Sequence, residues 1–122
     1  MYTDVLFTIE NGALLFQGIL FLCLTYYYRK NPPKKINHFY GYRTRRSMAN
    51  QEIWDVANRQ SAKDLWRVAL ATMISGLILL PFETTPKVFI QLGVLLLGIG
   101  IAVWHTEKEL DKTFDKNGNK QS

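Results

Sequence analysis

Three long runs of apolar residues constrain this chain more than any other feature of its sequence. They cover residues 13–28, 65–82 and 88–104, and each approaches the roughly 20 residues that a helix needs to cross a bilayer. A soluble domain of 122 residues would intersperse polar residues at helical or strand period within such segments. We therefore predict an all-α integral membrane protein, a single membrane domain over residues 1–122 with three transmembrane helices.

The three spans are predicted at about residues 5–28, 65–82 and 87–104. Pro32 and Pro33 cannot continue a helix, so the first span ends before them. Two starts of the first span are compatible with the charged residue Glu10. If the span begins near residue 12, Glu10 is interfacial; if it begins at residue 5, Glu10 lies within the span and faces protein or water. The short connector at 82–87 makes the second and third spans an antiparallel hairpin.

Between the first two spans, residues 29–64 form a polar loop. Ser47 and Asn50 are good N-cap residues, so a helix is expected to begin between them. Ile53, Ala57, Ser61 and Leu65 recur at a spacing of four, which predicts an amphipathic helix that lies along the membrane surface or packs on the spans. The tail, residues 105–122, is expected to extend the third helix to about residue 114 and then to fray.

The charge of the chain is unevenly distributed. Residues 29–67 contain ten basic and three acidic side chains, whereas the whole chain has a net charge of +5. Because basic loops stay on the cytoplasmic side, we predict that the loop and the C-terminus lie in the cytoplasm and that the N-terminus lies outside. The basic cluster suits lipid headgroups of the bilayer better than nucleic acid, since no recognition helix or base-stacking platform accompanies it.

Cys23, in the first apolar run, is the one cysteine of the chain, and we interpret it as a small packing residue. An acidic N-terminus and the absence of a small-x-small cleavage site argue against a signal peptide.

The polar loop contains a run of glycine, aromatic, arginine and amide residues at fixed spacing, I-N-x-x-x-G-Y-R-T-x-x-S-M-x-N-x-x-x-W-x-x-A-N. The residues that carry it, and that we single out as candidates for binding a ligand or partner, are Asn37, Gly41, Tyr42, Arg43, Thr44, Ser47, Asn50, Trp54 and Asn58, with Ile36, Met48 and Ala57 completing the pattern.

This pattern resembles the cytoplasmic signature of the SdpI family, bacterial multi-span membrane proteins. The resemblance extends to the prolines before the loop and to the flanking spans. It implies a helical protein of the bacterial inner membrane that confers immunity to a secreted antibacterial peptide, or that signals by holding a transcriptional regulator at the membrane. The partners it implies are therefore a peptide toxin and a cytoplasmic regulator.

Two interpretations of the motif stay open. In the structural one, Gly41 serves a turn, the amide and serine side chains cap helices or tie down the loop, and Trp54 anchors at the headgroup level. In the other, Arg43 binds a carboxylate or phosphate through its forked donors. Arg45 and Arg46 are interpreted as solvated, lipid-facing charges.

An enzyme is less well supported by the sequence. Ser47 has no recognisable base, and neither a glycine-rich phosphate loop nor a histidine-carboxylate metal spacing is present, so we expect no cofactor or metal. His105 and Glu109, four residues apart, are expected to form a surface pair. The alternative function is a membrane enzyme or transporter that handles a lipid or small anion through Arg43.

Overall fold

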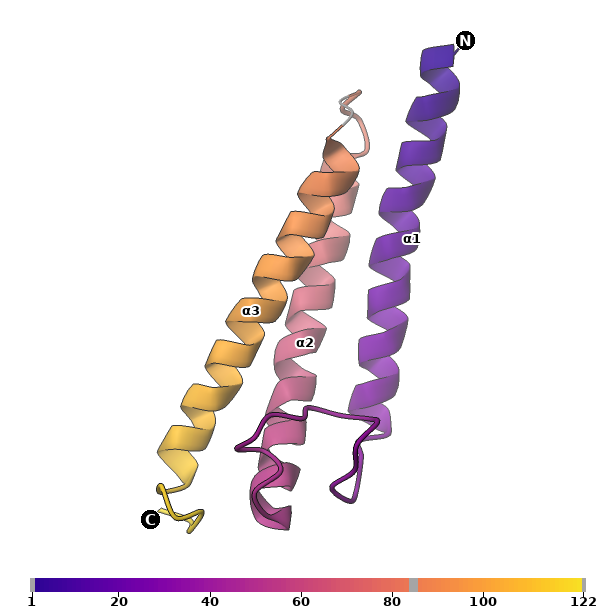
Figure 1. Ribbon diagram of the computed structural model, residues 1–122. Helices are drawn as coiled ribbons and strands as arrows, with labels where there is room; N and C mark the ends of the chain where they lie inside the picture. Colours follow the sequence, from indigo (N-terminus) through magenta and orange to yellow (C-terminus); the bar gives the residue numbers. More distant parts are fainter. Residues whose placement is uncertain (1, 84–85, 122) are drawn as a thin grey trace.

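The computed structural model describes residues 2–83 and 86–121 (Figure 1). They form three helices, of which the first two are joined by a long loop. In chain order these are α1 (Tyr2–Lys30), α2 (Gln51–Leu79) and α3 (Lys87–Thr113). Within these residues there is no strand, apart from a single antiparallel bridge between Phe114 and Lys120. The all-α class predicted from the apolar runs is confirmed.

α1 is uninterrupted because nothing within it breaks helical hydrogen bonding before the prolines that follow. The N–H of Asn31 still donates to the carbonyl of Tyr27 at 2.8 Å, and the helix ends there. At the other end the helix begins at Tyr2, so Glu10 lies about two turns inside it. Cys23 is exposed on this helix, and its interpretation as a packing residue was therefore wrong.

α2 joins the expected loop helix and the second apolar run into one continuous helix, so a separate amphipathic helix is not observed. Asn50 is its N-cap: the side-chain oxygen accepts from the N–H of Ile53 at 2.8 Å, as predicted. The predicted inward side is confirmed at Ile53, Ala57 and Ser61, which are buried, whereas Leu65 on the same side is half-buried. The helix ends at Leu79.

α3 extends beyond the third apolar run, as predicted, but the tail after it is not frayed. Phe114 is buried against Ile53, Ala57 and Leu110. The N–H of Gln121 donates to the carbonyl of Thr113 at 2.7 Å, which closes a small hairpin. The tail therefore packs on the first turns of α2. Burial of the Phe114 ring stabilises this packing, which the polar residues around Phe114 in the sequence did not indicate.

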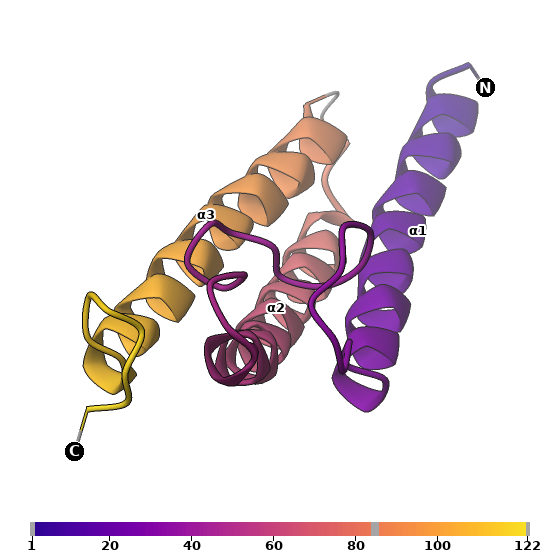
Figure 2. The same ribbon diagram turned by 60° about the horizontal axis from the view of Figure 1, so that its bottom comes forward.

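α2 is the central helix of the bundle. α1 and α3 each pack along it and scarcely contact one another. Close approach of α2 and α3 requires Gly98, where a Cβ atom would lie 2.7 Å from Cγ1 of Val68. The long loop leaves the end of α1, crosses over α2 towards α3, and returns to the start of α2 (Figure 2).

Two of the helices, α1 from Phe7 to Lys30 and α3, are long and apolar enough to cross a membrane. α2 does not meet the same criterion because its first half is polar and charged, so three spans stay a prediction. Part of the connector at 82–87 (Thr84 and Thr85) and Ser122 of the tail lie outside the described residues. Large apolar side chains along α1 and α3 are exposed, including Phe16, Phe89 and Leu97. Such surfaces suit a bilayer as solvent.

Polar side chains are buried at the end of the bundle far from the loop, a feature that the apolar sequence did not reveal. Lys87 is fully buried, and its ammonium donates to the side chain of Asn11 and to the carbonyl of Phe82. Gln91, also fully buried, donates to the carbonyls of Leu14 and Thr72 at 3.0 and 3.1 Å. These bonds tie α1 to α2 and α3 where apolar packing alone would let the helices slide.

Candidate functional site

Asn58 is the centre of the loop motif. It is buried on α2, and its side-chain oxygen accepts from the backbone N–H of Tyr42 and from the hydroxyl of Tyr28, both at 2.6 Å. Its amide nitrogen donates to the carbonyl of Trp54 at 3.0 Å. One side chain therefore joins α1, the loop and α2, which makes the position of the loop dependent on Asn58.

Trp54 packs beneath the loop and is completely buried. Its indole N–H donates to the carbonyl of Pro33 at 3.0 Å. The interpretation of Trp54 as an anchor at the headgroup level was therefore wrong, because a fully buried ring has no contact with the bilayer. The ring instead packs against the start of the loop, to which its N–H is hydrogen-bonded at Pro33.

Gly41 allows the loop to pass closely over α2. Its φ of +112° lies in the region that favours glycine, and a Cβ atom would meet Cγ of Pro33 at 2.6 Å and Oδ1 of Asn58 at 2.7 Å. The predicted turn with positive φ is confirmed. Any side chain at this position would push the loop away from Asn58.

Ser47 closes the second half of the loop. It is fully buried, and its hydroxyl accepts from the N–H of Thr44 at 2.8 Å and donates to the carbonyl of Tyr42 at 2.9 Å. The hydroxyl of Thr44 accepts in return from the N–H of Ser47 at 3.1 Å. Asn50 then caps α2 and also donates to the carbonyl of Gly118 at 3.1 Å. The serine and amide groups are thus used within the fold.

Asn37 and Arg43 shape the outer turn of the loop, and Arg43 also lines a cavity between the loop and the helices. The side-chain oxygen of Asn37 accepts from the N–H groups of Phe39 and Tyr40, at 2.9 and 2.7 Å. Arg43 is exposed and donates to the carbonyl of His38. The loop consequently holds Phe39 in solvent, 92% exposed, on a tightly hydrogen-bonded turn.

Tyr42 connects the loop to α3. Its hydroxyl donates to the carboxylate of Glu107 at 3.0 Å. Burial, and then the hydrogen bond and negative charge of Glu107, raise the pKa of the Tyr42 phenol above its ordinary value. Tyr42 therefore stays neutral over the physiological range. It makes the third contact that holds the loop, after those to α1 and α2.

The comparisons with known proteins bear on this arrangement. A family model described as the SdpI/YfhL protein family matches residues 34–107, which include the whole motif. The chain belongs to the SdpI/YfhL family. The resemblance inferred from the motif is thereby confirmed. A curated relative from Bacillus subtilis (strain 168), "Uncharacterized protein YfhL", is 34% identical over 114 residues, which cover 93% of this chain and 94% of the relative. No solved structure matches the chain.

The structure of this SdpI/YfhL chain divides the nine motif candidates into two groups. Seven lie together where the loop crosses the bundle: Gly41, Tyr42, Thr44, Ser47, Asn50, Trp54 and Asn58. Asn37 and Arg43 lie outside that contact and shape the outer turn.

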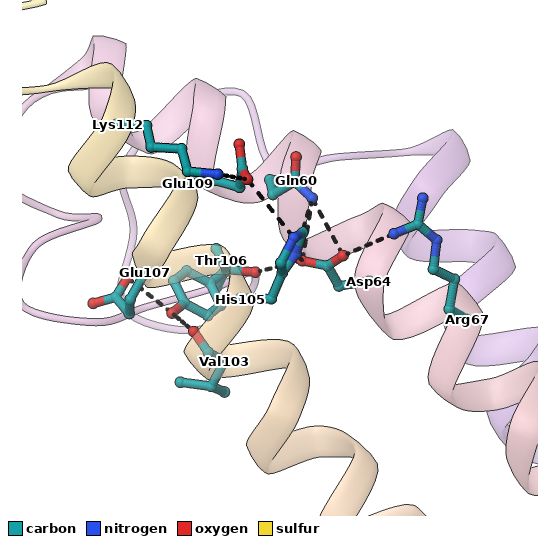
Figure 3. A network of polar contacts seen from close by, with 10 residues as sticks. Gln60, Asp64, Arg67, Val103, His105, Thr106, Glu107, Glu109 and Lys112 are labelled. Atoms are coloured by element: carbon teal, nitrogen blue, oxygen red, sulfur yellow. Dashed lines mark hydrogen bonds and ion pairs between the residues drawn. The ribbon is translucent and has the colours of Figure 1, made fainter. Parts of the chain in front are cut away.

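Sequence reasoning missed a second polar cluster, between α2 and α3 (Figure 3). Asp64 is buried at 5% exposure, and its carboxylate accepts from Nδ1 of His105 at 2.9 Å and from the hydroxyl of Thr106 at 3.0 Å. Arg67 lies 3.5 Å from the other carboxylate oxygen. His105 also lies 3.7 Å from Glu109, so the predicted surface pair exists as one part of a larger network. An acidic residue on the inward side of an amphipathic helix was the available signal.

Arg46 corrects another expectation. Its guanidinium pairs with Asp111 and donates to the carbonyl of Phe114 at 3.1 Å. It is therefore not a solvated, lipid-facing charge, since it ties the loop to the end of α3. Arg45, by contrast, is exposed as expected.

Within the described residues, no group of three or more His, Cys, Asp and Glu side chains is placed to hold a metal ion.

Proposed function

We propose that this chain is an SdpI-like inner-membrane protein that gives immunity to a secreted antibacterial peptide, or signals through a cytoplasmic regulator, by binding rather than by turnover. Family membership supports the proposal. The observation that carries it is the contact of Asn58 with Tyr42 and Tyr28, which fixes the loop on the bundle. A fixed loop presents the same outer surface to every partner, which lowers the entropic cost of binding.

The binding surface in this proposal is the outer side of the loop. Phe39 is 92% exposed there, and Arg43 and Arg45 are exposed beside it in sequence. A large exposed aromatic ring near forked guanidinium groups is the composition that protein interfaces favour. We assign this surface to the cytoplasmic partner.

The proposal includes three membrane spans, with α2 crossing between α1 and α3. α2 is flanked by the two apolar helices, and its second half, from Val68 to Leu79, is itself apolar. The basic loop supports a topology with the N-terminus outside and the C-terminus in the cytoplasm. Asn37→Cys in a Cys23→Ser background tests this orientation. We expect no reaction with an impermeant thiol reagent in intact cells and full reaction after lysis; reaction in intact cells would reverse the orientation.

The alternative, an enzyme or transporter with Arg43 as the anion clamp, is less well supported. Arg43 is exposed and donates to the carbonyl of His38 in its own loop. That bond uses part of the guanidinium fork on which a bidentate clamp depends.

The test is expression of the chain in a bacterium that is sensitive to the secretions of the producing strain. We expect survival with the wild-type chain and with Arg45→Lys, and loss of protection or of signalling with Arg43→Lys at equal amounts in the membrane. Arg43→Lys keeps the charge and loses the planar fork. Absence of protection, together with absence of any regulator cross-linked to the loop, would show that the proposal is wrong.

A further inference from the structure

α1 and α3 each pack on α2 and scarcely contact one another. A groove lined by residues of all three helices lies between them. Its apolar part is a cavity of about 300 Å³. Phe21 and Leu24 line it from α1, Val68 from α2, and Leu95 and Ile99 from α3. The size is at the lower end of the range of roughly 300–1,000 Å³ that is typical of ligand sites.

A second cavity, of about 380 Å³, lies at the end of the groove where the loop crosses it. Tyr42 and Arg43 of the loop and Ser61 of α2 line it. Tyr28 and Leu65 line both cavities, so the two are neighbours: the first has an almost entirely apolar lining, and the second adds the polar groups of Arg43, Thr44 and Ser61. Such a pair of compartments matches an amphiphile, with its chain in the first and its head in the second.

Arg43 is the one charged side chain among the described residues that line the two cavities. None of the described residues that line either cavity is acidic. Arg43 gives one donor to the carbonyl of His38, and its other donors have no partner within the described part of the chain. Glu107, the neighbouring acid, is occupied by the hydroxyl of Tyr42. A phosphate-bearing head group would therefore accept from the remaining N–H donors of Arg43, without the full bidentate fork.

We propose that the groove holds one bilayer lipid, with an acyl chain in the apolar cavity between α1 and α3 and an anionic, phosphate-bearing head under the loop. The lipid is bound and is neither chemically changed nor moved across the membrane. Leu24, on the wall of the apolar cavity, is 53% exposed, so the cavity is open to the surface that the bilayer covers. This inference rests on the proposed membrane location and is independent of the immunity role.

The experiment uses the full chain in a mild detergent. Native mass spectrometry should detect one retained phospholipid. Phosphatidylglycerol should raise the unfolding temperature more than phosphatidylcholine with the same chains, and inorganic phosphate alone should not. Loss of the retained lipid from the wild-type spectrum, or a full shift with phosphate alone, would overturn the proposal; the latter would indicate an ion site only.

Two variants separate the compartments. Ile99→Trp fills the apolar cavity and should reduce retained lipid several-fold, whereas Leu97→Trp, at a position that is 70% exposed and lines neither cavity, should leave it unchanged. Arg43→Gln should keep the retained lipid and lose the preference for phosphatidylglycerol. Equal retention in the two tryptophan variants, or an unchanged preference in Arg43→Gln, would contradict the proposal. If Ile99→Trp fails to fold, Arg43→Gln decides. Protection is scored in the same Arg43 variants as lipid retention and lipid preference, so a loss of protection with lipid binding unchanged, or the converse, shows which of the two proposals fails.

Discussion

The side-chain oxygen of Asn58 accepts a hydrogen bond from the backbone N–H of Tyr42 at 2.6 Å, although sixteen residues separate the two in sequence. The same oxygen accepts from the hydroxyl of Tyr28 on α1. All three groups are buried, so each would be left without water if the partner were removed.

Asn58→Leu is therefore expected to lower the free energy of unfolding by about 1–3 kcal/mol or more, because it leaves a buried N–H and a buried hydroxyl unsatisfied. Chemical unfolding in detergent measures this loss, and hydrogen exchange should be faster at the Tyr42 amide. Asn117→Ala, at an exposed position of the tail, is the matched control. If both variants unfold alike, Asn58 does not hold the loop.

Gly41→Ala tests the turn. Alanine at this position would have to adopt the observed φ of +112°, and its Cβ would overlap both Pro33 and Asn58. We therefore expect the free energy of unfolding to fall by about 1–3 kcal/mol. Gly93→Ala is the control, since a Cβ there meets nothing within 4 Å and alanine favours the helix by about 1 kcal/mol. The unfolding temperatures of the two variants measure this difference in stability. A Gly41→Ala protein as stable as Gly93→Ala would contradict the close passage of the loop.

Asp64→Ala tests the link between α2 and α3. It removes the buried acceptor of His105 and Thr106, and a loss of about 1–3 kcal/mol in unfolding free energy is expected. Lys112→Ala removes an exposed partner of Glu109 and should change stability by less than about 0.5 kcal/mol. Double variants of Asp64 and His105 should cost less than the sum of the single changes. Additive losses would mean that the two side chains do not interact.

Tyr42 predicts a dependence of stability on alkaline pH. Burial and Glu107 raise its pKa in the folded chain above the ordinary value of about 10. The stability that Tyr42 contributes is therefore complete below pH of about 10 and is lost as the pH rises above that value, because only the unfolded chain then releases the proton readily. Wild-type protein should lose more stability than Tyr42→Phe between pH of about 9 and 11. Parallel pH profiles for the two proteins would show that Tyr42 ionises alike in both states.

The sequence by itself determined the all-α class, the end of α1, the family and several local features of the loop. Apolar runs and the two prolines fixed where α1 ends, and Asn50 and Gly41 have the cap and the turn that their residue types predict. These features depend on backbone geometry and near neighbours, which a sequence displays directly.

Only the tertiary structure decided which polar groups meet. Trp54 is buried and donates to Pro33, Arg46 pairs with Asp111, and Asp64 accepts from His105 on α3. Each of these contacts joins residues that are distant in sequence. The tail packs for the same reason: Phe114 finds an apolar site formed by α2 and α3 together. A sequence gives the chemistry of such side chains, whereas their partners depend on how α1, α2 and α3 pack side by side.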